Sequence, residues 1–176
     1  RTVVRIDGSE QADGPFVEAD GMVSDRLDLL LTVTVADCLP IFLAEARTGA
    51  FGLVHSGWKG TGIVVEAVRA MTRAYGCRAA DIAVTIGPGI GPCCYAVPED
   101  RYGLFRADFG GRAVQRGLDG SFRLDLRAAN AALLEREGVG HISIVADCTA
   151  CSPLLGSFRR EGPGFTRMLA FIGAGG

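Results

Sequence analysis

The sequence predicts a single α+β domain over residues 1–176, with mixed β-sheets flanked by helices. Many short apolar runs rich in β-branched residues are separated by glycine, proline and aspartate, which is typical of strands and turns. Only three stretches show clear helical spacing, and they do not alternate strictly with the strands, which disfavours a doubly wound fold. A chain of 176 residues is also large enough to bury a core without disulfides or a structural metal.

The N-terminal third is expected to supply the centre of the sheet. Thr2–Asp7 alternates as a short strand, and turns are predicted at Gly8–Gly14 and Ala19–Gly21. Three apolar runs then lack a clean polar alternation, which predicts strands buried on both faces. These runs are Leu29–Ala36, Ile41–Ala44 and Ala50–Val54.

Helices are predicted in three places. Thr61–Tyr75 carries its apolar residues on one stripe, and Gly76 is suited to end that helix. Pro98–Phe109 begins with proline in its first turn, and Arg127–Glu137 ends before Gly138. In the last helix the inward residues are expected to be Ala128, Ala131, Leu133 and Leu134. Further strands are expected at Asp81–Ile86, Phe122–Leu126, His141–Ala146, Leu154–Arg160 and Arg167–Ile172, with a charged loop at Gly110–Gly120.

Composition excludes several classes of protein. The net charge of −2 disfavours nucleic acid as a partner, and no run of about 18 apolar residues indicates a membrane span. Six cysteines are too few for a secreted disulfide scaffold, so we expect reduced thiols in a cytoplasmic protein. The chain begins at Arg1 without a signal-like segment, and we expect its native N-terminus to lie upstream. The sequence leaves the oligomeric state open.

Cys38 and His55 are the first candidate site residues, because each follows or ends a predicted buried strand. Neighbouring strand ends are where sites are commonly built, so the two side chains are placed to converge. They could share a metal, or the protein could be a Cys–His hydrolase or deamidase with Cys38 as the nucleophile and His55 as its base. The alternative without function is a buried thiol and a hydrogen-bonded imidazole. Asp37 before the cysteine and the glycines of Ser56–Gly60 favour a functional role.

Gly87–Cys94 alternates glycine with other residues after a predicted strand, as dinucleotide-binding loops do. Pro88 and Pro92 remove two backbone donors, however, and no helix begins there, so the nucleotide-binding interpretation fails. We expect instead a tight loop that lines a pocket, with Cys93 or Cys94 on its wall.

Cys148 and Cys151 form a Cys-x-x-Cys pair that could be a redox pair, half of a zinc site, or strand-end thiols beside the pocket without either role. A four-thiolate site would have to recruit Cys93 and Cys94, and the roles of all four thiols stay open at this point. Arg159 could contact an anion or pair with an exposed carboxylate.

Four stretches in order resemble the laccase-domain family, also called multicopper polyphenol oxidoreductase or peptidoglycan editing factor. They are Val35–Ile41, Val54–Gly60, Ile86–Tyr95, and Cys148-Thr149 with Ser157–Glu161. The resemblance runs from about Asp13 to Met168. Members of this family are regarded as zinc-dependent purine nucleoside phosphorylases that also deaminate adenosine.

The resemblance implies that Cys38 and His55 are two of three protein ligands of a catalytic zinc. The third would be a histidine upstream of Arg1, and an open fourth position would take water, whose pKa zinc lowers toward neutrality. We therefore expect residues 1–176 alone to fold but to purify with little or no zinc, and to show weak or no activity on adenosine or inosine. Restoring the upstream segment would complete the site, whereas a non-catalytic module with a decayed site is the alternative.

The resemblance also implies substrates, namely phosphate and the purine nucleosides adenosine, inosine, guanosine and methylthioadenosine, without fixing the preferred one. Lys59 is the further catalytic candidate, and phosphate or substrate contacts are expected from Gly87, Gly89, Gly91, Cys93 and Arg159. Laccase chemistry is excluded by ligand count, because copper clusters need several histidines and this chain has only His55 and His141. Substitution of His141 should matter little.

Overall fold

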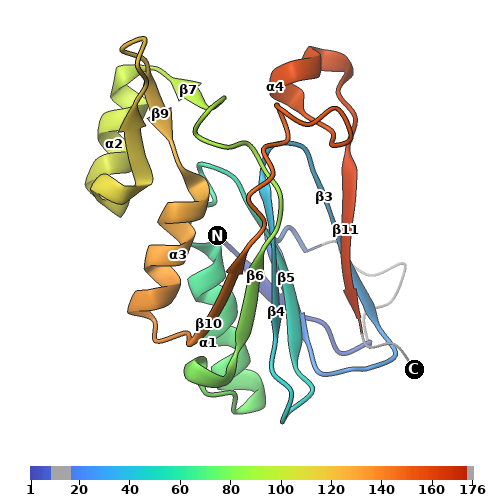
Figure 1. The fold of residues 1–176 in the computed structure, drawn as a ribbon. Helices are drawn as coiled ribbons and strands as arrows, with labels where there is room; N and C mark the ends of the chain where they lie inside the picture. Colours follow the sequence, from blue (N-terminus) through green and yellow to red (C-terminus); the bar gives the residue numbers. More distant parts are fainter. Residues whose placement is uncertain (9–16, 174–176) are drawn as a thin grey trace.

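A mixed six-stranded sheet lies at the centre of the structure (Figure 1), a computed structural model that describes residues 1–8 and 17–173. The strand order is β1-β2-β5-β4-β6-β10. β1 pairs with β2 and β10 with β6 in parallel, and the other neighbours are antiparallel. The six strands are β1 (Val3–Arg5), β2 (Gly21–Ser24), β4 (Leu39–Ala44), β5 (Phe51–Ser56), β6 (Ala83–Ile86) and β10 (His141–Ile144).

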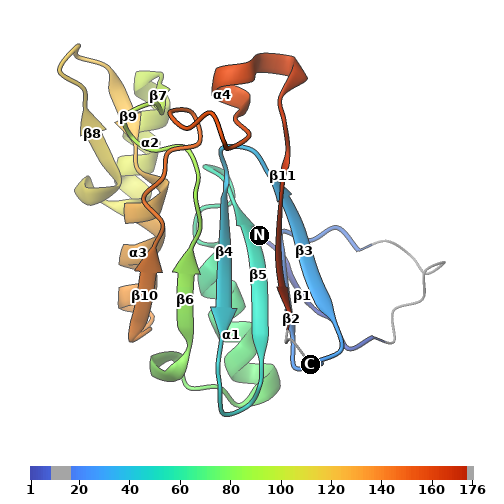
Figure 2. The ribbon, with the colours of Figure 1, turned by 45° about the vertical axis from the view of Figure 1, so that its right-hand side comes forward.

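One face of this sheet is covered by α1 (Ile63–Tyr75) and α3 (Leu126–Arg136), as Figures 1 and 2 show. The apolar stripe predicted for α1 is buried, and the helix ends at Gly76, whose φ of 68° is the left-handed conformation that glycine adopts without strain. The main core lies between these helices and the sheet, with Leu39, Ile41, Ile63, Met71 and Leu134 fully buried in it.

The opposite face carries an antiparallel ribbon of β3 (Leu30–Val35) and β11 (Met168–Gly173), visible in Figure 2. A smaller core around Leu31 and Phe51 joins the ribbon to the sheet. The prediction that β3 is buried on both faces was wrong, because its outer face is open and Leu30 is 61% exposed. The same prediction is confirmed for most of β4 and β5, which are sandwiched between the two cores.

A third, small sheet of β7 (Ala96–Val97), β9 (Phe122–Leu124) and β8 (Val114–Arg116) packs with α2 (Glu99–Phe109). The prediction that Gly110–Gly120 is a loop was partly wrong, because this stretch contains a short helix and β8. β2 and β7 were not expected, because they are too short for a periodic pattern.

Two further expectations need correction. Leu154–Arg160 is not a strand; its end forms the short helix α4 (Phe158–Glu161), begun by Ser157, whose hydroxyl accepts the N–H of Arg160. In α3, Leu134 is buried and Ala131 and Leu133 pack against the core as predicted, but Ala128 does not, and Ala129 and Asn130 are buried instead.

The architecture is α+β, as the sequence predicts. Most of the predicted turn at Gly8–Gly14 lies outside the described residues. None of the helices in the described ranges is both long and apolar enough to cross a bilayer.

Candidate functional site

A cavity of about 690 Å³ lies at one end of the central sheet, beside the turn from β3 to β4 and the carboxyl end of β5. β3 contributes Thr34 and Val35, the β3–β4 turn contributes Ala36, Asp37 and Cys38, and β5 contributes His55. This volume is in the range of small-molecule sites. Cavity walls that come from strand ends are held in place by the sheet itself.

Cys38 and His55 both line this cavity, as their strand-end positions predicted. Cys38 directly precedes β4, and the register pairs Pro40 of β4 with His55 of β5. The Cys38 sulfur lies over Gly57, where a Cβ atom would sit only 2.8 Å from Sγ. Glycine is therefore needed at position 57 for the thiol to reach the cavity.

Burial acts on both groups. It raises the pKa of the Cys38 thiol to about 11, with a contribution from the neighbouring Asp37 carboxylate. Burial also lowers the pKa of His55 against the opposing effect of Asp20, so the imidazole is neutral at neutral pH. A neutral imidazole can ligate a metal, and a thiol with such a pKa is a weak nucleophile until a cation displaces its proton.

Asp37 accepts hydrogen bonds from three separate segments of the chain beside the cavity. It has a φ of 73°, the only positive value at a non-glycine residue in the described ranges. Its Oδ1 accepts a hydrogen bond from the Thr149 hydroxyl at 2.6 Å and its Oδ2 from the Arg159 N–H at 2.7 Å. Its backbone carbonyl accepts the N–H of Ile90 at 2.8 Å. One residue in a strained conformation thus contacts the loop after β6, the loop after β10 and the helix α4, and such strained residues are common at functional sites.

Three guanidinium groups belong to the cavity wall, from Arg101, Arg159 and Arg167. In the described part of the chain, none of them forms an ion pair with a carboxylate. Arg159 is oriented by its bond to the Cys94 carbonyl, at 2.9 Å. The wall therefore presents three guanidinium groups outside any ion pair among the described residues, against the single carboxylate of Asp37, and this excess of positive charge suits an anionic ligand.

Each of these guanidinium groups lies over an aromatic ring of the site. Arg101 is 4.3 Å from the centre of the Trp58 ring, and Arg159 and Arg167 lie over Tyr95 and Phe165. Phe158 meets Phe165 edge to face, with ring centres 5.2 Å apart. Trp58, Tyr95, Phe158 and Phe165 all line the cavity, which provides flat apolar faces beside the charges.

The other predicted site residues lie elsewhere. Lys59 lines a neighbouring cavity of about 250 Å³, which shares Trp58 and Arg101 with the main one. Gly87 and Gly89 pack closely on Pro40 and Leu39, so they hold the loop against β4 and do not line the cavity. From that loop the cavity receives Ile90 and Tyr95 instead.

The sequence did not predict most of the arginine and aromatic side chains that line the cavity. Arg101, Phe165 and Arg167 lie outside every motif, and no local pattern marks them. Tyr95 and Phe158 do lie within the family motifs, so their aromatic character was a usable signal.

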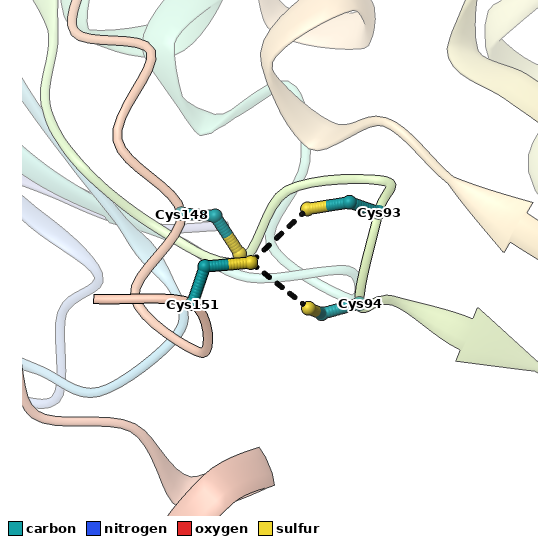
Figure 3. Close-up of side chains that lie close together, drawn as sticks. All are labelled: Cys93, Cys94, Cys148 and Cys151. Atoms are coloured by element: carbon teal, nitrogen blue, oxygen red, sulfur yellow. Dashed lines mark hydrogen bonds between the residues drawn. The ribbon is translucent and has the colours of Figure 1, made fainter. Parts of the chain in front are cut away.

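A second constellation lies outside the cavity, where Cys93, Cys94, Cys148 and Cys151 come together (Figure 3). Their sulfur atoms all lie within 4.8 Å of one another, so the four thiols could hold a metal ion. Cys93 and Cys94 follow β6, and Cys148 and Cys151 follow its parallel neighbour β10. An isolated bridge between Gly89 and Cys148 continues the pairing of these strands.

Hydrogen bonds lower the pKa of Cys148, whereas the pKa values of Cys93 and Cys94 are raised. Burial would raise the pKa of this thiol, but the N–H groups of Gly91 and Cys151 and the thiols of Cys93 and Cys151 lower it to about 7. The Gly91 N–H lies 3.2 Å from the Cys148 sulfur. In Cys93 and Cys94, by contrast, burial raises the pKa.

Comparison with known families and proteins gives a consistent result. The sequence profile of the family described as multi-copper polyphenol oxidoreductase laccase matches residues 1–175. A purine nucleoside phosphorylase of Deinococcus radiodurans is 38% identical over 165 residues, which cover 93% of this chain and 64% of that protein. The purine nucleoside phosphorylase YlmD of Geobacillus stearothermophilus is 37% identical over 162 residues, covering 88% of this chain and 59% of its own length. The chain thus spans about three fifths of these relatives.

The same likeness holds in three dimensions. The crystal structure of YlmD from Geobacillus stearothermophilus matches with a TM-score of 0.88 and 34% identity, over 98% of this chain and 69% of that one.

Proposed function

The chain belongs to the multi-copper polyphenol oxidoreductase laccase family, and we propose that it is a zinc-dependent purine nucleoside phosphorylase. The observation that carries this proposal is the composition of the cavity wall. A thiol, an imidazole, three arginines whose guanidinium groups form no ion pair with any residue that the structure describes, and a set of aromatic rings line one space of about 690 Å³. These are the groups that a metal, a phosphate and a purine base require.

Cys38 and His55 fit a zinc ion by their chemistry. Zinc binds thiolate sulfur and imidazole nitrogen together, and His55 is held in the neutral form that can ligate. When bound, zinc would act as a Lewis acid toward a substrate oxygen or a water molecule.

The position of Arg1 supports a third ligand from an upstream segment, as expected from the family. The N–H of Thr2 and the amino group of Arg1 both contact the Asp20 carboxylate, at 3.1 and 3.5 Å. The Asp20 carbonyl in turn accepts the N–H of His55 at 2.8 Å. A residue attached before Arg1 would therefore enter close to the end of β5 that carries His55. We propose that a histidine there completes the zinc site.

The arginines are the proposed binding groups for phosphate. Guanidinium groups stay charged at all relevant pH values and hold two phosphate oxygens at once. The Arg159 N–H donates to the Asp37 carboxylate and its guanidinium donates to the carbonyls of Cys94 and Ala96, so its charge is positioned before phosphate arrives. Lys59 in the neighbouring cavity would add positive charge, and the Gly87–Gly91 loop with Cys93 would act indirectly by supporting Tyr95.

The aromatic faces of Trp58, Tyr95, Phe158 and Phe165 would hold the purine base and exclude water from the glycosidic bond. In phosphorolysis a phosphate oxygen bonds to C1′ of the sugar as the bond from C1′ to N9 breaks. The electron pair leaves with N9, which takes up a proton. The cations of the wall would stabilise the phosphate throughout this displacement.

We also propose the deamination of adenosine as a side activity at the same site. Water replaces the 6-amino group, and ammonia leaves with inosine as the product. Adenosine, inosine, guanosine and methylthioadenosine share a purine joined through N9 to C1′ of a furanose sugar, so all four are proposed substrates of phosphorolysis.

The experiment is a turnover assay with inosine and inorganic phosphate, on protein that includes its upstream residues and is supplied with zinc. Release of hypoxanthine and ribose 1-phosphate in equal amounts is expected. Cys38→Ala should remove turnover, whereas Cys77→Ala, which changes a buried thiol far from the cavity, should retain it. Turnover by Cys38→Ala at the unsubstituted rate would contradict the assignment.

The phosphate assignment has its own test. Arg167→Gln should raise KM for phosphate by about tenfold or more with a smaller change in KM for inosine, because one charge-assisted contact contributes about 1.5–3 kcal/mol. Arg112→Gln, an exposed arginine paired with Glu135 away from the cavity, is the matched control and should leave both constants unchanged. Equal effects of the two variants would refute the role of the cavity arginines.

A further inference from the structure

We propose that Cys93, Cys94, Cys148 and Cys151 bind one zinc ion as a tetrathiolate site, which is separate from Cys38 and His55 and structural in role. None of the four cysteines lines the cavity. The site would therefore add a second metal to the one proposed for catalysis.

The spacing of the sulfur atoms fits a single ion. The Cys151 sulfur lies 3.7 Å from that of Cys93 and 3.4 Å from that of Cys94, and all four sulfurs lie within 4.8 Å of one another. Four sulfurs at about 2.3 Å from one zinc ion in a tetrahedron are about 3.8 Å apart. A disulfide would need a separation of about 2.05 Å. An iron–sulfur cluster distributes its thiolates around several iron atoms and so spreads them more widely.

A buried positive charge beside the thiols, that of Arg127, supports a bound metal with thiolate ligands. The Arg127 side chain is only 9% exposed and forms no ion pair with a carboxylate in the described ranges. Its Nε is buried without a hydrogen-bond partner, and its other nitrogens bind only backbone carbonyls. A buried cation without a counter-charge is costly. Zinc with four thiolates carries a net charge of −2, which would compensate it.

Arg127 is close enough for this compensation. A Cβ atom on Gly91 would lie 3.5 Å from Nη1 of Arg127, 3.2 Å from the sulfur of Cys93 and 3.2 Å from Cβ of Cys148. Gly91 thus separates the guanidinium from the thiols by the width of one residue. The sulfur-only donor set in a tetrahedral arrangement suits zinc or iron, and the redox-inert ion suits a structural site.

The site would fix the wall of the cavity. Cys94 precedes Tyr95, and its carbonyl accepts the hydrogen bond that orients Arg159. Cys148 precedes Thr149, whose hydroxyl binds Asp37. Since the thiols come from the two loops after β6 and β10, a shared ion would lock these loops together at the edge of the cavity.

The experiment measures zinc in the purified Cys38→Ala/His55→Ala protein, reduced and supplied with zinc. We expect one zinc ion per chain in this variant, and zinc-edge X-ray absorption should show four sulfur neighbours at about 2.3 Å. Adding Cys151→Ser should lower zinc affinity by more than tenfold, whereas adding Cys77→Ser, a thiol outside the cluster, should not.

Several outcomes would overturn the proposal. They are no zinc in the Cys38→Ala/His55→Ala protein, a metal shell with nitrogen or oxygen neighbours, iron in preference to zinc when both are supplied, or a mass lower by two hydrogens that shows a disulfide. The absorption spectrum is recorded on protein with all four thiols intact, so the test does not depend on folding of the cysteine variant. Because the cavity ligands are absent from this protein, failure of the proposed phosphorylase activity would leave the result unaffected.

Discussion

Replacing Asp37 should destabilise the protein more than its position in a surface turn suggests. Its carboxylate accepts two short hydrogen bonds, from Thr149 and from the backbone of Arg159. A bond to a charged acceptor contributes about 1.5–3 kcal/mol, and because Asp37 is half-buried we take the lower value for each. Alanine adds about 1 kcal/mol for the left-handed backbone at φ 73°. Asp37→Ala should therefore lower the free energy of unfolding by about 4 kcal/mol.

Asp37→Asn separates these contributions. Asparagine tolerates the left-handed conformation, and its carbonyl oxygen can still accept the Thr149 hydroxyl. Its NH₂ group would face the N–H of Arg159, so one bond is lost and the cost should be about 1.5 kcal/mol. The two variants should thus differ by about 2.5 kcal/mol.

Urea unfolding in zinc-containing, reducing buffer, followed by circular dichroism and by the fluorescence of the single tryptophan, measures both values. Asp108→Ala, an exposed carboxylate in the last turn of α2, is the control and should change stability by less than about 0.5 kcal/mol. An Asp37→Ala protein within 1 kcal/mol of the unsubstituted one would refute the anchoring role. Equal losses of stability in Asp37→Ala and Asp37→Asn would refute the division of the Asp37 contribution between hydrogen bonds and backbone conformation.

Two other predictions concern packing and pH. Gly89→Ala would place Cβ 2.5 Å from the Leu39 side chain and should lower stability by about 1–3 kcal/mol, whereas Gly103→Ala in α2 meets nothing within 4 Å and should raise it by about 0.5–1 kcal/mol. Thermal unfolding compares the two, and similar shifts would show that the loop can relax. The N–H groups of Thr166 and Ser157 hold the pKa of Glu161 at about 2, below its ordinary 4.5. Because the folded-state pKa is depressed, its stabilisation is present above pH 4.5 and is lost as the pH falls toward 2. Glu161→Gln should therefore flatten the acid limb of a stability profile, and an unchanged limb would contradict this reasoning.

The centre of the fold was predictable, because β4, β5 and α1 bury residues in the periods that their sequences show. β3 was misjudged since its outward Leu30 is apolar, and no local pattern tells an exposed leucine from a buried one. The helix α4 had a readable signal. Ser157 accepts the N–H of Arg160, and its own N–H donates to Glu161, a reciprocal pair like a capping box but with the glutamate four residues after the serine instead of three.

In the site, Cys38 and His55 could be placed in one cavity because each marks the end of a buried strand. The thiol cluster could not, because its four members meet only if β6 and β10 are parallel neighbours. That pairing joins strands separated by two helices, α2 and α3, and depends on tertiary packing. Arg101 and Arg167 likewise reach the cavity from elements whose own sequences give no sign of it.

The most direct test of the proposed active site uses the only two histidines of the chain. His55 lines the cavity, whereas His141 is exposed at the start of β10 and is absent from the cavity lining. The measurement is phosphate-dependent release of hypoxanthine from inosine by His55→Ala and His141→Ala proteins, both with their upstream residues and with zinc. Loss of turnover in His55→Ala with full turnover in His141→Ala is the predicted result. Full turnover by His55→Ala, or equal losses in both, would contradict the account.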